Sequence, residues 1–136
     1  IVTQHLRPLG EHEPDWVATA ERLIGAPYLW GGKTLLGMDC SGLVQTALTN
    51  AGIRSPRDSD MQEKALGKPL SLANGSPPLR RGDFVFWKGH VGMMLDADRL
   101  LHANAHHMTV TVEPLDAAVE RIRKGLGPVT GIRRIS

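Results

Sequence analysis

The single cysteine of this chain, Cys40, stands where a sequence can make a thiol reactive. Its neighbours Asp39, Ser41 and Gly42 are small or polar, and Asp39 is suited to cap a helix that continues through the apolar residues after Gly42. A helix N-terminus lowers the pKa of a thiol, because unpaired backbone N–H groups and the helix dipole stabilise the thiolate. These residues therefore indicate a nucleophile as readily as an ordinary buried cysteine.

Two histidines further along the chain could serve such a nucleophile. His90 lies between two predicted strands with a glycine on its N-terminal side, and it could act as a base for Cys40, since nucleophile and base meet in space rather than in sequence. His102 lies on the next strand and could bind the other ring nitrogen of His90, which would hold its tautomer as the third member of a triad does. Each histidine could equally be an ordinary hydrogen-bonded residue of a strand.

Other chemistries find less support in the sequence. His106 and His107 suggest a zinc site with His102, but no cysteine or carboxylate stands at zinc-ligand spacing, and adjacent strand residues point to opposite faces. Glycine-rich phosphate loops and a G-x-S-x-G elbow are absent. The net charge of +2 and an aromatic content of 4% do not suit a nucleic-acid surface. We therefore expect no metal, no cofactor, no nucleic acid and no membrane association.

The elements that would position these side chains indicate one α+β domain. We expect helices first and then a run of short strands, which favours an antiparallel sheet of about five strands with helices packed against it. The predicted helices are 14–24, 39–51, 59–66 and 114–123, and the predicted strands are 83–87, 91–95, 99–103, 108–113 and 131–135. The rest of 53–80 is predicted to be mostly loop. Residues 1–13 are interpreted as a leader or linker, and 14–136 as the domain.

Six short strings occur in an order that is typical of one protein family. They are Gly-Ala-Pro-Tyr-Leu-Trp-Gly-Gly at 25–32, Asp-Cys-Ser-Gly at 39–42, Pro-Arg-Asp-Ser at 56–59, Gly-Asp-Phe-Val-Phe-Trp at 82–87, Gly-His-Val-Gly at 89–92 and Leu-His-Ala at 101–103. Together they resemble the NlpC family of bacterial papain-like cell-wall cysteine peptidases. The resemblance implies a papain-like fold in which Cys40 is the nucleophile, His90 the general base and His102 the orienting third residue.

The resemblance is strongest to the γ-D-glutamyl-L-diamino acid endopeptidase branch of that family. It implies that Asp39 and Ser59, together with Tyr28, bind the free amine of an N-terminal L-Ala, and that cleavage follows D-Glu. Tyr28 would also shape the oxyanion region. Arg57 lies beside this motif, and we interpret it either as a substrate contact or as a surface arginine in a salt bridge that pins a loop.

The expected partners follow from the same resemblance. They are the stem peptides of peptidoglycan, and relatives with this specificity carry bacterial SH3-type domains before the catalytic domain, so the chain could be a domain excised from a longer protein. We expect a monomer, with peptide recycling in the cytoplasm favoured over the periplasm or secretion. Two alternatives stay open: a papain-like amidase or acyltransferase with a different substrate, and a non-catalytic module that binds the cell wall.

Overall fold

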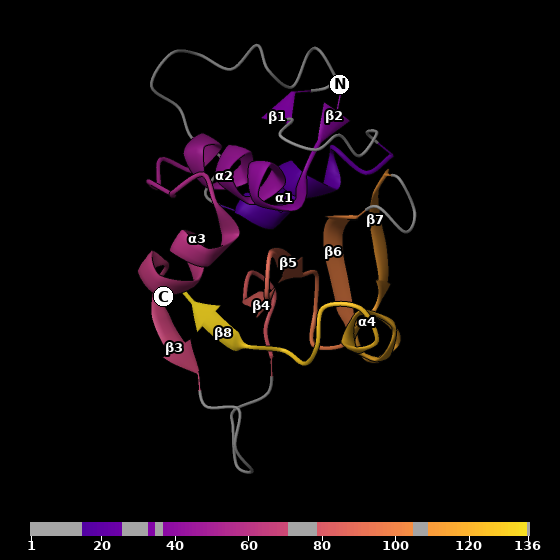
Figure 1. Ribbon diagram of the computed structural model, residues 1–136. Coiled ribbons are helices and arrows are strands. Elements are labelled where there is room, and N and C mark those ends of the chain that lie inside the picture. The colour runs from indigo at the N-terminus through magenta and orange to yellow at the C-terminus, as the bar shows by residue number, and fades with distance from the viewer. Residues whose placement is uncertain (1–14, 26–32, 35–36, 71–78, 105–108, 136) are drawn as a thin grey trace.

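The structure of the chain is a computed structural model that describes residues 15–25, 33–34, 37–70, 79–104 and 109–135 (Figure 1). The predicted leader or linker, residues 1–13, and Tyr28 lie outside the described residues. The elements are α1 (Trp16–Glu21), β1 (Lys33–Thr34), β2 (Gly37–Met38), α2 (Cys40–Asn50), α3 (Ser59–Ala65), β3 (Lys68–Leu70), β4 (Phe84–Trp87), β5 (His90–Met94), β6 (Arg99–Asn104), β7 (Thr109–Pro114), α4 (Leu115–Arg123) and β8 (Gly131–Arg134).

The main sheet confirms the α+β prediction and corrects its strand number. Six strands pair antiparallel in the order β3-β8-β4-β5-β6-β7, where about five were expected. The additional strand is β3, in a stretch predicted to be mostly loop. It is a three-residue edge strand with Pro69 at its centre and largely exposed side chains, so it carries no alternating apolar pattern. A separate two-stranded hairpin, β1-β2, also escaped prediction because each strand has only two residues.

The first helix is shorter at its C-terminal end than predicted. Asp15 caps it by accepting hydrogen bonds from the backbone N–H groups of Val17 and Ala18, at 3.1 and 3.3 Å. The helix ends at Glu21 rather than near Ile24, because the following N–H groups bond three residues back and tighten the chain into a turn. The predicted start at Pro14 lies outside the described residues.

The sheet is covered on both faces. In β4, Phe84 and Phe86 pack into the cluster that includes residues of α1 and α2, whereas Val85 and Trp87 pack into a second cluster with α4. Figure 1 agrees, with α1 and α2 together at one side of the strands and α4 against β6 and β7 at the other. All four residues of β4 are buried as a result. The central strands are therefore a rigid support for the hairpin that carries His90.

Within the described residues, every helix is too short or too polar to cross a lipid bilayer.

Candidate active site

Cys40 is the first residue of α2, as predicted. The carboxylate of Asp39 caps this helix, with Oδ1 accepting a hydrogen bond of 2.6 Å from the backbone N–H of Gly42. The Cys40 Sγ lies 4.0 Å from the carbonyl oxygen of Gly89, the residue immediately before His90. Gly89 has a φ of +76°, which a side-chain-bearing residue rarely adopts, and it closes the tight turn between β4 and β5. The turn therefore brings the start of β5 to the N-terminus of α2.

The protonation of the thiol differs from the sequence-based expectation. Burial raises the pKa of the Cys40 thiol, and the negative charge of Asp39 raises it further. Hydrogen bonds from the backbone of Val91 and Ser41 act in the opposite direction without outweighing burial. The helix N-terminus was expected to lower this pKa, but the side chain is only 8% exposed, and desolvation disfavours the anion. The resting thiol is thus protonated, and attack on a substrate needs a base.

His90 and His102 are in direct contact. His90 Nε2 and His102 Nδ1 are 2.7 Å apart, and both rings are buried, His102 completely. In the β5–β6 register Met93 lies opposite Leu101, which places Gly92 opposite His102. His90 is two residues before Gly92, so it meets His102 diagonally across the two strands. The structure therefore brings together the two histidines that the sequence paired, and it leaves Nδ1 as the second ring nitrogen of His90.

Gly92 is what allows the two histidines to approach across the strands. A Cβ atom at this position would lie 2.7 Å from Leu100 Cδ1 and 3.1 Å from the Cβ of His102. Both distances are tighter than ordinary contacts, so any side chain here would push the histidine away from its partner. The second glycine of the Gly-His-Val-Gly string therefore has a steric role beside the candidate site.

His90 is neutral in this environment. Burial, followed by the proximity of His102 and of the positive Arg121, lowers the pKa of His90 to about 3. Trp87 contributes to this burial, since its ring centroid lies 5.5 Å from that of His90. A neutral imidazole can accept a proton, which is the state that a general base requires before attack.

Two further residues join the histidines, and the sequence analysis missed both. His102 Nε2 lies 2.6 Å from Glu113 Oε2, and Arg121 binds both oxygens of that carboxylate, at 2.5 and 2.8 Å. Partial burial alone would raise the pKa of Glu113, but the hydrogen bonds and charges of Arg121 and His102 hold it well below its usual range. The signal available in the sequence was Glu113 itself, an acidic residue near the end of the strand that follows the strand of His102.

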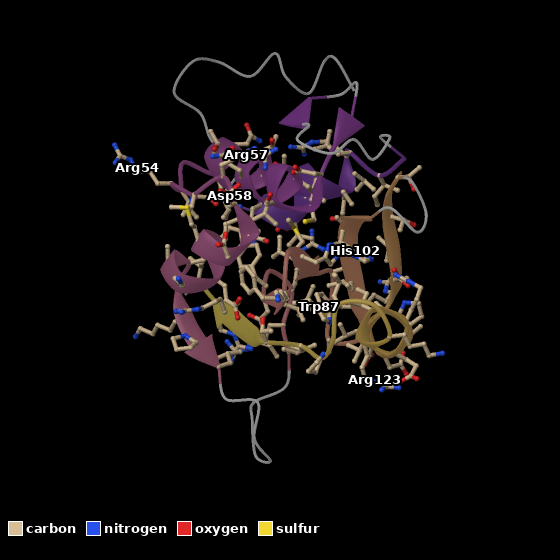
Figure 2. The ribbon with its side chains drawn as sticks, in the orientation of Figure 1. Arg54, Arg57, Asp58, Trp87, His102 and Arg123 are labelled. Atoms are coloured by element: carbon tan, nitrogen blue, oxygen red, sulfur yellow. The ribbon has the colours of Figure 1, made fainter. Side chains whose placement is uncertain are left out.

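A pocket opens beside Cys40. Its volume is about 470 Å³, and its lining consists of Asp39, Cys40, Ser41, Arg57, Asp58, Ser59, Asp60 and Gly89. Three of these residues are aspartates and one is an arginine, so the lining has an excess of negative charge. Figure 2 shows Arg57 and Asp58 near one another between α2 and α3, whereas Arg54 points away from them. The pocket can therefore attract a cationic group to the neighbourhood of the thiol.

The predicted substrate-binding residues occupy different places in this pocket. Ser59 is the first residue of α3 and is 9% exposed, and Asp39 is 7% exposed. Arg57 donates to Asp39 Oδ2 at 3.0 Å and to Ser41 Oγ at 2.9 Å. These contacts agree with the interpretation of Arg57 as an arginine whose salt bridge pins a loop. Tyr28, the remaining predicted substrate-binding residue, lies outside the described residues.

No group of three His, Cys, Asp or Glu side chains among the described residues is arranged to hold a metal ion. His106 and His107, the remaining candidates for such a site, lie outside the described part of the chain.

Comparisons with known proteins agree on one family. The model of the NlpC/P60 family matches residues 25–122. Dipeptidyl-peptidase 6 of Lysinibacillus sphaericus is 36% identical over 100 residues, which are 74% of this chain and 35% of that protein. The gamma-D-glutamyl-L-lysine dipeptidyl-peptidase of Bacillus cereus is 31% identical over 110 residues, which are 75% of this chain and 32% of that protein. The chain thus spans about a third of the length of these curated relatives.

A solved structure shows the same fold. The peptidoglycan hydrolase RipB of Mycobacterium tuberculosis superposes with a TM-score of 0.70 at 31% identity, covering 89% of this chain and 63% of the other.

Proposed function

Because the chain belongs to the NlpC/P60 family, we propose that it is a cysteine peptidase that hydrolyses the amide bond between γ-D-Glu and the diamino acid of peptidoglycan stem peptides. The observation that carries this proposal is the hydrogen-bonded pair of His90 and His102, together with the contact of Cys40 Sγ, at the N-terminus of α2, with the carbonyl oxygen of Gly89, the residue before His90. A thiol, a neutral imidazole and a group that orients the imidazole are the parts that nucleophilic acyl transfer needs.

The reaction would proceed in two acyl-transfer steps. His90 takes the proton of the Cys40 thiol as the sulfur attacks the γ-glutamyl carbonyl carbon, and the backbone N–H of Cys40 would stabilise the oxyanion. The tetrahedral intermediate collapses as protonated His90 gives its proton to the leaving amine of the diamino acid, which leaves a thioester on Cys40. Water, deprotonated by His90, then attacks the thioester and releases the glutamate carboxylate and the thiol.

The acidic pocket supports a substrate with a free amine. Asp39, Asp58 and Asp60 line the space next to Cys40, and Arg57 is the only cation among the described residues of the lining. A carboxylate cluster of this kind favours the ammonium group of an N-terminal L-Ala over a neutral acetylated end. The similar protein of Bacillus cereus is named a gamma-D-glutamyl-L-lysine dipeptidyl-peptidase, which agrees with the proposed substrate.

Hydrolysis of L-Ala-γ-D-Glu-meso-diaminopimelate is expected to be much faster than hydrolysis of the same peptide with its amine acetylated. Neutralising the ammonium group removes its attraction to the pocket carboxylates, and we expect at least a tenfold loss of kcat/KM, the equivalent of about 1.4 kcal/mol. The measurement is the rate of diaminopimelate release from each peptide, followed by chromatography. Recovery of an equal amount of free L-Ala-D-Glu separates hydrolysis from acyl transfer to another amine, since both reactions release the diamino acid.

Asp39→Asn is the matched variant, since asparagine still caps a helix but carries no charge. Its kcat/KM should fall for the free-amine peptide and change little for the acetylated one. Asp98→Asn, in the exposed turn between β5 and β6, removes the same charge away from the pocket and should behave as wild type. Equal cleavage of the two peptides by the wild-type protein would contradict the proposed amine recognition while leaving the peptidase assignment in place.

A further inference from the structure

We propose that Gln62 of α3 is a positioning residue of the candidate active site. Its buried amide holds Ser55 and Pro56 against α2 and so fixes residues 57–60, which form one wall of the pocket. This inference rests on the proposed cysteine-peptidase function, because that pocket is the proposed substrate site. The juxtaposition that carries it is one fully buried amide in contact with both the first turn of α2 and the chain that leads into α3.

The amide nitrogen of Gln62 faces three oxygen atoms. On the chain that leads into α3, Gln62 Nε2 lies 2.8 Å from the carbonyl oxygen of Pro56 and 3.2 Å from Ser55 Oγ. On α2, it lies 3.1 Å from the carbonyl oxygen of Ser41, the residue after the proposed nucleophile. Carbonyl oxygens only accept hydrogen bonds, so the NH₂ group rather than the amide oxygen must point towards them. A single side chain of α3 therefore joins the two segments.

The chain held in this way continues directly into the pocket wall. Arg57 and Asp58, the first two residues of the wall, line the space next to the thiol, and Figure 2 shows both between α2 and α3. Ser59, another lining residue, begins α3 three positions before Gln62, so the two share the buried face of that helix. Fixing the amide of Gln62 thus fixes the wall against which a substrate would be seated for attack.

The amide is not needed to fill the core. Gln62 Oε1 is buried and has no hydrogen-bond partner among the described residues, so a desolvated acceptor is left unpaired. Gln62→Met fills a similar volume without that oxygen. In the variant, the carbonyl oxygen of Pro56 would still accept a hydrogen bond from Ser55 Oγ, at 3.0 Å, and the carbonyl oxygen of Ser55 would still accept one from Gln45, at 3.1 Å. We therefore expect the variant to fold with its pocket wall less firmly placed.

Gln62→Met is expected to weaken substrate binding without slowing the chemistry at the thiol. We expect KM for L-Ala-γ-D-Glu-meso-diaminopimelate to rise about tenfold and kcat to stay within about twofold of wild type, as for a loss of uniform binding. Acylation of Cys40 by p-nitrophenyl acetate, whose acetyl group is too small to fill the pocket, should keep its wild-type rate, measured by nitrophenolate release. Equal losses for the two substrates would mean general damage to the fold and would overturn the inference.

The placement of the pocket wall can also be measured without a peptide substrate. Backbone ¹⁵N relaxation of the full chain gives an order parameter for each amide. In the wild-type protein we expect residues 55–60 to be as ordered as α2, at about 0.85, and in Gln62→Met we expect them to fall towards about 0.6 while α2 is unchanged.

Glu63→Met is the matched control, since Glu63 is the next residue of α3. Glu63 Oε2 accepts a hydrogen bond of 2.8 Å from Thr130 Oγ1, so this variant removes a contact of the same helix that does not reach the pocket wall. It should keep the wild-type KM and the wild-type order parameters at 55–60.

The outcomes of these measurements separate the inference from the proposed function. Unchanged KM and unchanged order parameters in folded Gln62→Met would overturn the inference, as would equal changes in Gln62→Met and Glu63→Met. The expected order parameters in a protein that cleaves no γ-D-glutamyl peptide would support the positioning by Gln62 and refute the proposed function instead.

Discussion

Replacing Cys40 with alanine is expected to lower the rate of γ-D-glutamyl peptide hydrolysis by about 10⁴-fold or more, to the limit of detection. The sulfur is the atom proposed to form the covalent intermediate, and Cys40 is the single cysteine of the chain. The measurement is diaminopimelate release under the same conditions for wild-type and Cys40→Ala protein.

The alanine variant should remain folded, which makes its activity interpretable. Cys40 belongs to the core cluster under α2, but truncation removes only one sulfur atom from the edge of that cluster. We expect a loss of about 1 kcal/mol in the free energy of unfolding, at the low end for core truncations. Circular dichroism and the melting temperature check this. Retention of peptidase activity by the folded variant would mean that the nucleophile is not Cys40.

Replacing Arg134 with methionine is expected to lower the free energy of unfolding by about 3 kcal/mol. Arg134 Nε and Nη2 donate to the two oxygens of Asp83 at 2.8 and 2.7 Å, and Asp83 is 1% exposed. The same carboxylate accepts a hydrogen bond from the backbone N–H of Arg80. Without the guanidinium, a buried negative charge loses its counter-ion at the point where β8 is joined to β4.

Arg99→Met provides the control for this loss, measured by urea unfolding. Arg99 forms its ion pair with Asp96 at the surface, where both side chains are well exposed, so its removal should cost less than about 1 kcal/mol. Arg134→Met combined with Asp83→Asn should recover part of the stability, because the amide leaves no uncompensated charge. Equal effects at Arg134 and Arg99 would show that the buried pair contributes no more than a surface pair.

The residues of the candidate site could be predicted where their signals are local. Asp39 caps the helix that begins at Cys40, and the tight turn at Gly89 comes directly before His90, so short strings of sequence were enough. The pKa of the thiol could not be predicted in the same way. The helix N-terminus is visible in sequence, but the degree of burial that raises the pKa depends on what packs over α2.

The contribution of Glu113 depends on strand register, which the sequence leaves open. A shift of one residue between β6 and β7 would place Glu113 on the other face of the sheet, away from His102. Arg121 could be connected to the site only by knowing that α4 packs beside β7. His102 was therefore predictable from the sequence as a candidate. Glu113, which contacts His102, and Arg121, which contacts Glu113, were not.

The fold class was predictable for a similar reason. The apolar residues of α2 and of the central strands are strong local signals for a helix and for strands. The structure confirms the α+β architecture that they predict. The missing strand, β3, is held by its pairing with β8 rather than by its own apolar residues. Tertiary pairing decides such edge strands, and a single sequence contains little trace of it.

The formation of a thioester on Cys40 is the most direct test of the proposed chemistry. The substrate is an activated ester of L-Ala-γ-D-Glu, whose good leaving group makes acylation faster than hydrolysis of the thioester, so the intermediate accumulates. Acid-quenched samples are analysed by intact-protein and peptide mass spectrometry. We expect the mass of an L-Ala-γ-D-glutamyl group on the peptide that contains Cys40, and its removal by hydroxylamine. Turnover of the ester by the protein at the same rate in wild type and Cys40→Ala, with no acyl group on either, would contradict nucleophilic catalysis by Cys40.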